Sequence, residues 1–182
     1  MKLSPRLLRE RARAVELLVL DVDGVLTDGG LFYGPDGEAL KRFDVKDGHG
    51  LVLAHLTGLR AAVLTARRSA IVEKRAAELW LSPVSQGNRD KRAGLFALLE
   101  EAGVPPERAG FVGDDVNDLP PLSEVGLACC PSDAVPEVRR IAHYVARAKG
   151  GHGAVREIVE LILKAQGRWE QALELMRTGR RD

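Results

Sequence analysis

The sequence predicts an α/β fold in which a doubly wound parallel sheet is covered by helices on both of its faces. The first observation behind this prediction is that short, almost continuously apolar segments alternate with amphipathic segments along the whole chain. Strands that are buried on both faces form such apolar runs, and the helices that cover them form amphipathic stretches. The second observation is the length of 182 residues, which fits one domain over residues 1–182 and leaves no room for a large cap domain.

The expected elements follow one another in a regular order. A basic amphipathic helix leads the chain within residues 1–16. Strands are expected at residues 17–22, 59–64, 83–85, 109–112, 126–128 and 143–145. Helices are expected at residues 48–57, 69–79, 89–102, 135–142 and 153–176. The last of these helices carries more apolar residues than a peripheral helix needs, so it either docks on the sheet or lies between subunits.

One segment interrupts the alternation of strands and helices. Residues 31–33 and 39–44 flank the sequence Gly34-Pro35-Asp36-Gly37, in which each residue type favours a turn. We therefore expect a β-hairpin insertion over about residues 30–44, which is too small to be a domain of its own.

Composition and charge exclude several classes of protein. Apolar residues make up 45% and charged residues 29% of the chain, which excludes a disordered protein. Lys and Arg (27) nearly balance Asp and Glu (26), and a net charge of +1 gives no basic surface of the kind that nucleic acid binding needs. No apolar run approaches the roughly 20 residues that span a membrane, and arginines interrupt any signal-peptide core near the start. Adjacent Cys129 and Cys130 cannot easily bridge each other, so we expect a cytoplasmic protein without a disulfide scaffold.

Two carboxylates stand where the first predicted strand ends and a glycine turn begins, in the sequence Leu20-Asp21-Val22-Asp23-Gly24. The carboxyl ends of strands are where open α/β sheets build their sites. Residues two apart on a strand project to the same side, so both carboxylates can converge on one ligand. Like charges at this spacing repel each other unless a divalent cation or a shared proton compensates them.

A second acidic cluster follows the strand expected at residues 109–112 and contains Asp114, Asp115 and Asp118. Oxygen-only clusters of this kind suit Mg²⁺, and the four histidines lack ligand spacing with one another or with the cysteines. Mg²⁺ is therefore the expected cofactor. Thr65 at the end of another strand and Lys91 at the start of a helix add a hydroxyl and an ammonium group of the kind that hold a phosphoryl group.

The order of these four groups along the chain is Asp-x-Asp, Thr, Lys and Gly-Asp-Asp-x-x-Asp. It resembles the order in the haloacid-dehalogenase superfamily of Asp-nucleophile phosphotransferases, which has a Rossmann-like core. Within that superfamily the chain is similar to the small, nearly capless branch of 3-deoxy-D-manno-octulosonate 8-phosphate phosphatases. The resemblance covers almost the whole chain, including residues 22–29, the hairpin, residues 43–50, Arg67, Arg75 and residues 150–157.

The resemblance implies a phosphatase that works through an aspartyl-phosphate intermediate. Asp21 would be the nucleophile, and Asp23 would protonate the leaving group and then activate water. Mg²⁺ would bind Asp21, the backbone carbonyl of Asp23, and Asp114. The same resemblance gives supporting roles to four further residues: Asp115 and Asp118 orient the metal ligands, and Thr65 and Lys91 hold the phosphoryl oxygens.

The implied substrate is a phosphorylated keto-sugar acid, with 3-deoxy-D-manno-octulosonate 8-phosphate as the favoured compound. The resemblance places around it Asp23, Asp44, Val45, Lys46, Asp47, Gly48, Arg67, Arg75 and Lys91. An arginine fork suits the carboxylate of such a sugar chemically. Three positions depart from the family pattern: Asp44 stands where Asn is common, Val52 where a basic residue is frequent, and Ala66 where Gly usually follows the threonine.

Three other interpretations compete with this one. A phosphatase of a related nine-carbon keto-sugar acid 9-phosphate would share the fold and the chemistry, but that sister group tends to carry Glu at the position of Arg67. A receiver domain of two-component signalling also uses Asp, Thr and Lys at strand ends, but its phosphoacceptor Asp stands alone in the middle of the chain. A catalytically inactive relative is disfavoured because every catalytic position is present.

A capless enzyme of this size leaves its site open to water, so something else must enclose the sugar. The predicted hairpin and the segment over residues 150–176 carry apolar residues beyond what one small sheet can cover. We expect a homotetramer, as in the family branch, in which hairpins pack together and each site borrows Arg75 or tail residues from a neighbour. The glycines at positions 150, 151 and 153 would let the tail swing over the bound sugar.

Overall fold

The computed structural model describes residues 3–179, and its centre is a sheet of six parallel strands. The strands lie in the order β5-β4-β1-β6-β7-β8, and each neighbouring pair in this sheet is parallel. Their bounds are β1 Leu17–Leu20, β4 Arg60–Thr65, β5 Val84–Gln86, β6 Ala109–Val112, β7 Leu127–Cys130 and β8 Tyr144–Val145. The predicted fold class, a doubly wound parallel α/β sheet, is confirmed.

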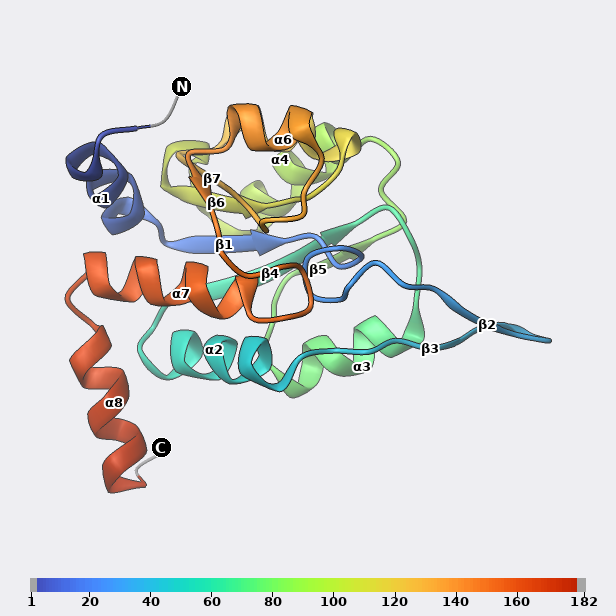
Figure 1. The fold of residues 1–182 in the computed structure, drawn as a ribbon, viewed down its shortest axis with the longest axis horizontal. Helices are drawn as coiled ribbons and strands as arrows, with labels where there is room; N and C mark the ends of the chain where they lie inside the picture. Colours follow the sequence, from blue (N-terminus) through green and yellow to red (C-terminus); the bar gives the residue numbers. More distant parts are fainter. Residues whose placement is uncertain (1–2, 180–182) are drawn as a thin grey trace.

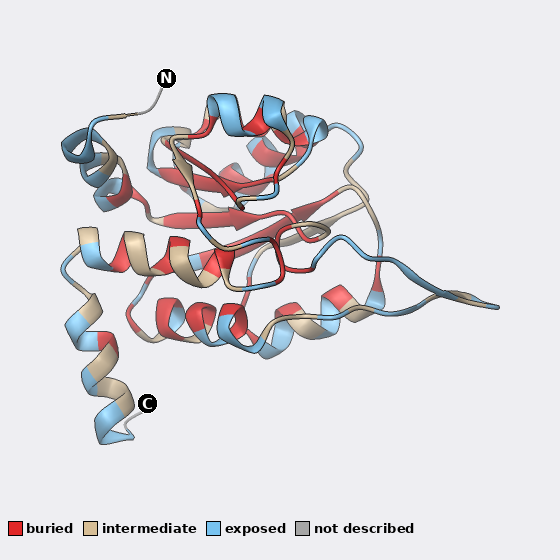
Figure 2. Ribbon diagram, viewed as in Figure 1, coloured by how far each residue is buried: buried red, intermediate tan, exposed pale blue. Residues whose placement is uncertain are grey.

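Helices cover both faces of the sheet (Figure 1). On one face lie α2 (Val45–Leu56), α3 (Ala70–Glu78) and α7 (Ala154–Ala165), with α1 (Pro5–Ala14) packed beside α7. On the other face lie α4 (Lys91–Ala102), α5 (Leu119–Glu124) and α6 (Pro136–Ile141). Figure 2 shows that burial is concentrated on the strands and on the inward sides of these helices.

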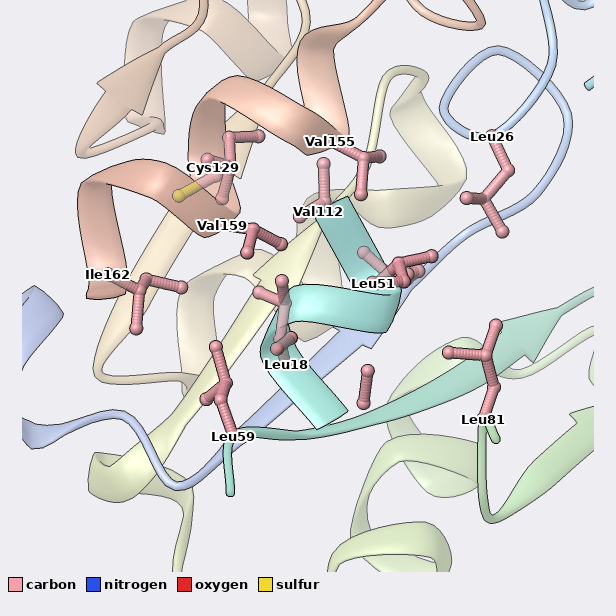
Figure 3. Close-up of a cluster of buried hydrophobic side chains, with 14 of the residues drawn as sticks. Leu18, Leu26, Leu51, Leu59, Leu81, Val112, Cys129, Val155, Val159 and Ile162 are labelled. Carbon is pink, nitrogen blue, oxygen red and sulfur yellow. The ribbon is translucent and has the colours of Figure 1, made fainter. Parts of the chain in front are cut away.

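The sheet divides the core into two apolar layers. Side chains of β1 alternate between them, so that Leu18 belongs to the layer under α2 and α7, whereas Leu17 belongs to the layer under α4. Figure 3 shows the first layer, where Leu51 of α2 and Val159 of α7 lie together with Leu18. Full burial of a leucine-sized side chain stabilises a fold by roughly 1.5–3 kcal/mol. The strand ends that carry the acidic residues are therefore held by a well-packed core.

Capping side chains set where the helices at the edge of the sheet begin. The Asp44 carboxylate accepts hydrogen bonds from the N–H groups of Lys46 at 2.7 Å and Asp47 at 3.3 Å. As a result α2 begins at Val45, before the predicted start at residue 48. Ser69 caps α3 in the same way, and Asp90 caps α4.

The single helix predicted over residues 153–176 is wrong, because the structure divides this segment into α7 and α8 (Trp169–Thr178). Gly167 between them has φ +72°, a left-handed conformation that ends helices. The apolar spacing continues across this break, and periodicity alone therefore predicts one helix. The apolar face of α7 is buried against the sheet and α2, whereas α8 lies at the end of the molecule opposite the hairpin (Figure 1).

Three short helical segments are absent from the sequence prediction. They are α5 and the 3-10 helices η1 (Pro106–Arg108) and η2 (Val116–Asp118). Segments of this length contain too few turns to show a helical period. Among the described residues, no helix is long and apolar enough to cross a membrane.

The predicted hairpin is present as β2 (Phe32–Gly34) and β3 (Gly37–Leu40), which pair antiparallel and project away from the main sheet (Figure 1). Its turn uses Gly37 at φ +111°, a conformation that residues with a side chain rarely adopt. The second strand ends at Leu40, earlier than the predicted residue 44, because the chain then returns to the body of the protein and enters α2.

Candidate active site

Seven of the predicted site residues line one cavity at the carboxyl end of the sheet. Asp21 and Asp23 follow β1, Thr65 ends β4, and Asp114 follows β6, and these three strands are neighbours in the sheet. The cavity has a volume of about 160 Å³ and is lined by Asp21, Asp23, Thr65, Ala66, Arg67, Lys91, Asp114, Asp115 and Asn117. Asn117 was not predicted as a site residue, although it lies within the second acidic run of the sequence.

Lys91 is a buried cation between two carboxylates. Its Nζ atom lies 2.8 Å from Oδ2 of Asp21 and 2.6 Å from Oδ1 of Asp118, and only 1% of its side chain is exposed. Burial works to lower the pKa of Lys91, but the two carboxylates outweigh burial and raise that pKa. The ammonium group therefore stays charged next to Asp21, in the position to bind an anionic oxygen.

Asp118 is fully buried behind the cavity and holds the second acidic loop. One of its oxygens accepts the hydrogen bond from Lys91, and the other accepts from the backbone N–H groups of Asp114 at 2.9 Å and Asp115 at 3.3 Å. A side chain at Gly113 would collide with Asp118, because a Cβ atom there would lie 2.5 Å from the Asp118 Cβ. Asp118 thus links the loop after β6 to Lys91.

The carboxylates of this site fit a divalent cation. Asp21, Asp114 and Asp118 each offer an oxygen, and these three oxygens lie within 4.8 Å of one another. Oδ1 of Asp21 and Oδ1 of Asp114 are buried and have no hydrogen-bond partner among residues 3–179. Buried carboxylate oxygens without a partner are costly unless a cation binds them. Hard oxygen ligands of this kind are the ones that Mg²⁺ prefers.

The pKa values of two carboxyls show the same excess of negative charge. Burial, followed by repulsion from Asp118, raises the pKa of Asp21 to about 6 despite the nearby Lys91. Burial, followed by repulsion from Asp21 and Asp118, raises the pKa of Asp114 to about 8. A bound cation would offset both causes, because it stabilises the charged carboxylates that burial and repulsion disfavour.

Glycines allow the loop after β1 to approach its neighbours closely. Gly24 has φ +89°, and a Cβ atom there would lie 2.0 Å from Oδ2 of Asp114. A Cβ atom at Gly150 would lie 1.8 Å from the carbonyl oxygen of Gly24, and the N–H of Gly151 donates to the carbonyl of Val25 at 3.0 Å. In this structure Gly150 and Gly151 therefore pack the tail loop against the loop that carries Asp23.

The Asp23 carboxylate lies on the side of the cavity that faces the hairpin. Oδ2 is 3.6 Å from Nε of Arg67, and Oδ1 accepts a hydrogen bond from Nζ of Lys41 at 2.5 Å. Arg67 also donates to the hydroxyl of Tyr33 at 2.6 Å. Lys41 and Tyr33 were not predicted as site residues, and the sequence signal for Lys41 was a pair of opposite charges, Glu38 and Lys41, at the end of the hairpin.

The structure places the predicted substrate residues of α2 outside the cavity lining. They are Asp44, Val45, Lys46, Asp47 and Gly48. The Asp44 carboxylate caps α2, as described above, and the buried Asp47 carboxylate accepts from the N–H groups of Gly153 at 3.0 Å and Arg156 at 2.8 Å. The Asp47 side chain thus fixes the start of α7, and a direct contact with a sugar stays a prediction.

Arg75 also lies outside the cavity lining, in the contact between α2 and α3. Its guanidinium lies over the ring of Phe43 at 5.7 Å and pairs with Glu78 at 3.0 Å. Gly48 gives it room, because a Cβ atom there would lie 2.3 Å from an Arg75 nitrogen. The predicted role of Arg75 in binding a substrate of its own or of a neighbouring chain stays a prediction.

Comparison with known proteins decides the family. A family model described as haloacid dehalogenase-like hydrolase matches residues 74–158. The 3-deoxy-D-manno-octulosonate 8-phosphate phosphatase of Escherichia coli K12 is 42% identical over 162 residues, which are 89% of this chain and 86% of that protein. The chain belongs to the 3-deoxy-D-manno-octulosonate 8-phosphate phosphatase family. The predicted resemblance is confirmed.

Solved structures of the family extend the match to the fold. The Moraxella catarrhalis 3-deoxy-D-manno-octulosonate 8-phosphate phosphatase, in complex with a magnesium ion, a phosphate ion and KDO, is 35% identical with a TM-score of 0.91. That match covers 95% of this chain and 99% of the Moraxella chain. The cobalt-bound enzyme of Haemophilus influenzae is 36% identical with a TM-score of 0.86, and the match covers 90% of this chain and 99% of the other.

Proposed function

We propose that this protein is a Mg²⁺-dependent phosphatase that hydrolyses 3-deoxy-D-manno-octulosonate 8-phosphate to the free sugar acid and phosphate. The observation that carries the proposal is the cavity in which Asp21 and Asp114 have buried oxygens without partners beside Asp23, Thr65 and Lys91. Membership in a family whose Moraxella member was solved with magnesium, phosphate and KDO supports the same metal, reaction and substrate.

In this proposal Lys91 and Thr65 hold the phosphoryl oxygens. The charged Lys91 ammonium attracts them, and the Thr65 hydroxyl donates a hydrogen bond. Asp21, Asp114 and the backbone carbonyl of Asp23 would hold Mg²⁺, and the chemistry that the ion supplies is compensation of negative charge at the nucleophile and the phosphoryl group. Asp115 and Asp118 would orient this set, Asp118 through its contacts with Lys91 and with the backbone of Asp114.

The reaction then needs two displacements at phosphorus. A carboxylate oxygen of Asp21 attacks phosphorus, the bond from phosphorus to the sugar oxygen breaks, and Asp23 gives its proton to that oxygen. In the second step Asp23 takes a proton from water, and the water oxygen attacks the phosphorus of the aspartyl-phosphate. The bond from phosphorus to Asp21 breaks, phosphate leaves, and both aspartates return to their starting states.

Arg67 is the residue that we propose for recognition of the sugar acid. It lines the cavity beside Asp23 on the side of the hairpin, and its side chain is 41% exposed, so its guanidinium can meet a carboxylate. The other proposed contacts come from residues 44–48 and Arg75, which lie outside the lining of this cavity. These residues can contact a sugar only if the sugar extends beyond this cavity or is bound in the site of a neighbouring chain.

The assembly that we propose is a homotetramer in which the hairpins pack together. Leu31, Phe32, Tyr33 and Leu40 of the hairpin are 44–63% exposed, an arrangement that supports an interface. The helix α8 lies at the opposite end of the molecule, so it can contribute only to the site of another copy (Figure 1).

We also propose that residues 1–182 form one domain and that the protein is cytoplasmic. The two apolar layers of the core pack on opposite faces of one sheet, which supports a single domain. Cys129 and Cys130 are free thiols and fully buried, which fits a reducing compartment. A single cooperative unfolding transition and recovery of the protein in the cytoplasmic fraction of its cells would test these two proposals.

A panel of phosphate-release assays tests the substrate. Purified protein with Mg²⁺ is given eight- and nine-carbon keto-sugar acid phosphates, with hexose phosphates as controls, and kcat/KM is compared. We expect the highest value for 3-deoxy-D-manno-octulosonate 8-phosphate. A higher value for the nine-carbon compound would favour the sister activity, for which Arg67 is the wrong residue. A higher value for a hexose phosphate would reject a sugar-acid phosphatase.

A further inference from the structure

Lys41, which directly follows β3, lies against the Asp23 carboxylate at the rim of the cavity. Only 1% of the Lys41 side chain is exposed, although the neighbouring hairpin residues are exposed. A lysine with its ammonium group buried is unusual unless it is paired. Here Nζ lies 2.5 Å from Oδ1 of Asp23 and 2.9 Å from Oε1 of Glu38. Burial works to lower the pKa of Lys41, but these two carboxylates outweigh it and raise that pKa.

Glu38 connects Lys41 to the body of the protein. Its other oxygen accepts a hydrogen bond from the hydroxyl of Ser69, the residue that caps α3. A continuous series of contacts thus joins Asp23, Lys41, Glu38 and Ser69. This series fixes the position of the Lys41 ammonium, since Ser69 belongs to a helix that packs on the core. Lys41 is therefore a fixed partner for Asp23 and not a mobile surface lysine.

The Asp23 side chain has few other partners. Among the described residues, its ion-pair partners are Lys41 and Arg67, and the Arg67 contact is longer at 3.6 Å and belongs to a side chain that is 41% exposed. Asp23 also lines the cavity together with Asp21 and Asp114, two carboxyl side chains that offer it no ion-pair partner. An acid–base group needs to lie within hydrogen-bond reach of the oxygen that it protonates.

We propose that Lys41 is a positioning residue that holds the Asp23 carboxyl group in the place from which its acid form transfers a proton to the leaving group. This inference rests on the proposed function, because it assigns Asp23 the acid–base role in phosphoryl transfer. The hairpin then has a part in catalysis within its own chain, separate from any contact between chains. A purely structural role, in which Lys41 only fastens the hairpin, is the alternative that the experiment must exclude.

The experiment is a double-mutant cycle between Lys41 and Asp23. Lys41→Met is made in the wild-type protein and in Asp23→Asn, and kcat/KM is measured with an alkyl substrate, the sugar phosphate, and with an aryl phosphate. This parameter reports the steps up to departure of the leaving group, and an aryl leaving group needs little protonation. Lys74→Met, at an exposed lysine of α3, is the matched control and should keep wild-type rates.

Losing an acid–base group altogether typically costs about 10²–10⁴-fold, so we expect Lys41→Met to lower kcat/KM for the sugar phosphate by at least about 10-fold. The loss for the aryl phosphate should be several times smaller. In the Asp23→Asn protein the same change should cost nothing more, since Lys41 acts through Asp23. Lys41→Arg, which keeps the charge, should recover part of the rate, and Glu38→Gln should show a weaker loss with the same preference for the sugar phosphate.

Three results would overturn the inference. They are wild-type rates in Lys41→Met, equal losses for the two substrates, and a further loss when Lys41→Met is added to Asp23→Asn. If Lys41→Met does not fold, as judged by its thermal unfolding curve, Lys41→Arg and Glu38→Gln carry the same comparison. If the sugar phosphate is not hydrolysed, the proposed function fails, and the cycle is run on whichever alkyl phosphate the protein does hydrolyse.

Discussion

At the scale of single residues, one buried ammonium group faces three carboxylates. Lys91 bonds to Asp21 and Asp118, while a buried oxygen of Asp114 has no hydrogen-bond partner in residues 3–179. Burial and the neighbouring carboxylates therefore favour the protonated form of Asp114 when no cation is bound. A proton and a metal ion compete for the same buried carboxylates. This competition makes the stability of the protein and its response to metal depend on pH.

The stability of the metal-free protein should fall as the pH rises towards 8. The pKa of Asp114 is raised from 3.8 to about 8 in the folded state, and that of Asp21 to about 6. Between pH 3.8 and about 8 the folded state therefore binds more protons than the unfolded state, so stability is lost as the pH rises through this range. Thermal unfolding with a chelator should give a lower Tm at pH 8 than at pH 6, and Mg²⁺ should raise the Tm more at pH 8.

The control for this prediction is Asp114→Asn, in which the pH dependence and the response to Mg²⁺ should both become smaller. The prediction is contradicted if the metal-free protein gains stability from pH 6 to pH 8 relative to Asp114→Asn. An equal rise of the Tm with Mg²⁺ at both pH values would also contradict it, because proton and metal would then not compete.

Some positions in the site can be predicted from the sequence, and others cannot. Asp21 directly follows β1, Thr65 ends β4, and Asp114 lies two residues after the end of β6. The carboxyl ends of parallel strands meet at one edge of the sheet, so the meeting of these residues follows from the fold class. The contact of Lys41 with Asp23 depends on the angle at which the hairpin leaves the sheet. No local pattern encodes that angle, and the contact appears only in the folded chain.

At the scale of elements, the tail loop and the loop after β1 form a single packed unit. Gly150 meets the carbonyl of Gly24, and its own N–H donates to Asp133 at 3.0 Å. The N–H of Gly151 donates to the carbonyl of Val25. The loop that carries Asp23 is thus supported from behind by residues more than a hundred positions later in the sequence.

Gly150→Ala should displace this loop and lower activity. A Cβ atom at this position would lie 1.8 Å from a backbone oxygen, so one of the two loops must shift. The expected results are a lower Tm and a loss of kcat with sugar and aryl phosphates alike. Gly167→Ala is the control, because Gly167 has φ +72° and nothing within 4 Å of a Cβ atom. It should cost about 1–3 kcal/mol of stability from backbone strain and leave kcat unchanged. Equal kcat losses in the two variants would contradict this account of the loop.

Element boundaries were harder to predict than element types. The strands of the sheet lie within two residues of their predicted ends, since short apolar runs are distinct in the sequence. The break between α7 and α8 falls at Gly167, and the start of α2 is set by the Asp44 cap. Both signals are local and visible in the sequence. However, the helical spacing of apolar residues continues past Gly167, and it begins only after the Asp44 cap.

At the scale of the whole molecule, the hairpin carries an apolar patch that the body of the protein does not cover. Phe32 and Leu40 are partners across the two strands and are 46% and 50% exposed. The ion pair between Lys41 and Glu38 and the hydrogen bond from Arg67 to Tyr33 fix the base of the hairpin, so the patch has a defined orientation. This arrangement suits an interface between copies of the chain.

The double variant Phe32→Asp with Leu40→Asp should dissociate the proposed tetramer. Light scattering should give a mass about four times the 19.8 kDa chain for the wild-type protein and a smaller mass for the variant. Dissociation should weaken binding of the sugar phosphate more than that of an aryl phosphate. The control adds the same charges elsewhere, as Leu7→Asp with Ile141→Asp at two other exposed apolar residues. A wild-type monomer that is fully active at nanomolar concentration would contradict the proposed tetramer.

The proposed mechanism requires that Asp21 becomes phosphorylated during turnover, and an acid-quench experiment can detect this phosphorylation. Protein that is turning over 3-deoxy-D-manno-octulosonate 8-phosphate with Mg²⁺ is quenched in acid, digested and mapped by mass spectrometry. We expect a phosphoryl group on the peptide that contains Asp21. The Asp21→Asn variant should show neither this group nor turnover, although it should still bind phosphate. A phosphoryl group on a different residue, or turnover of Asp21→Asn at the wild-type rate, would contradict it.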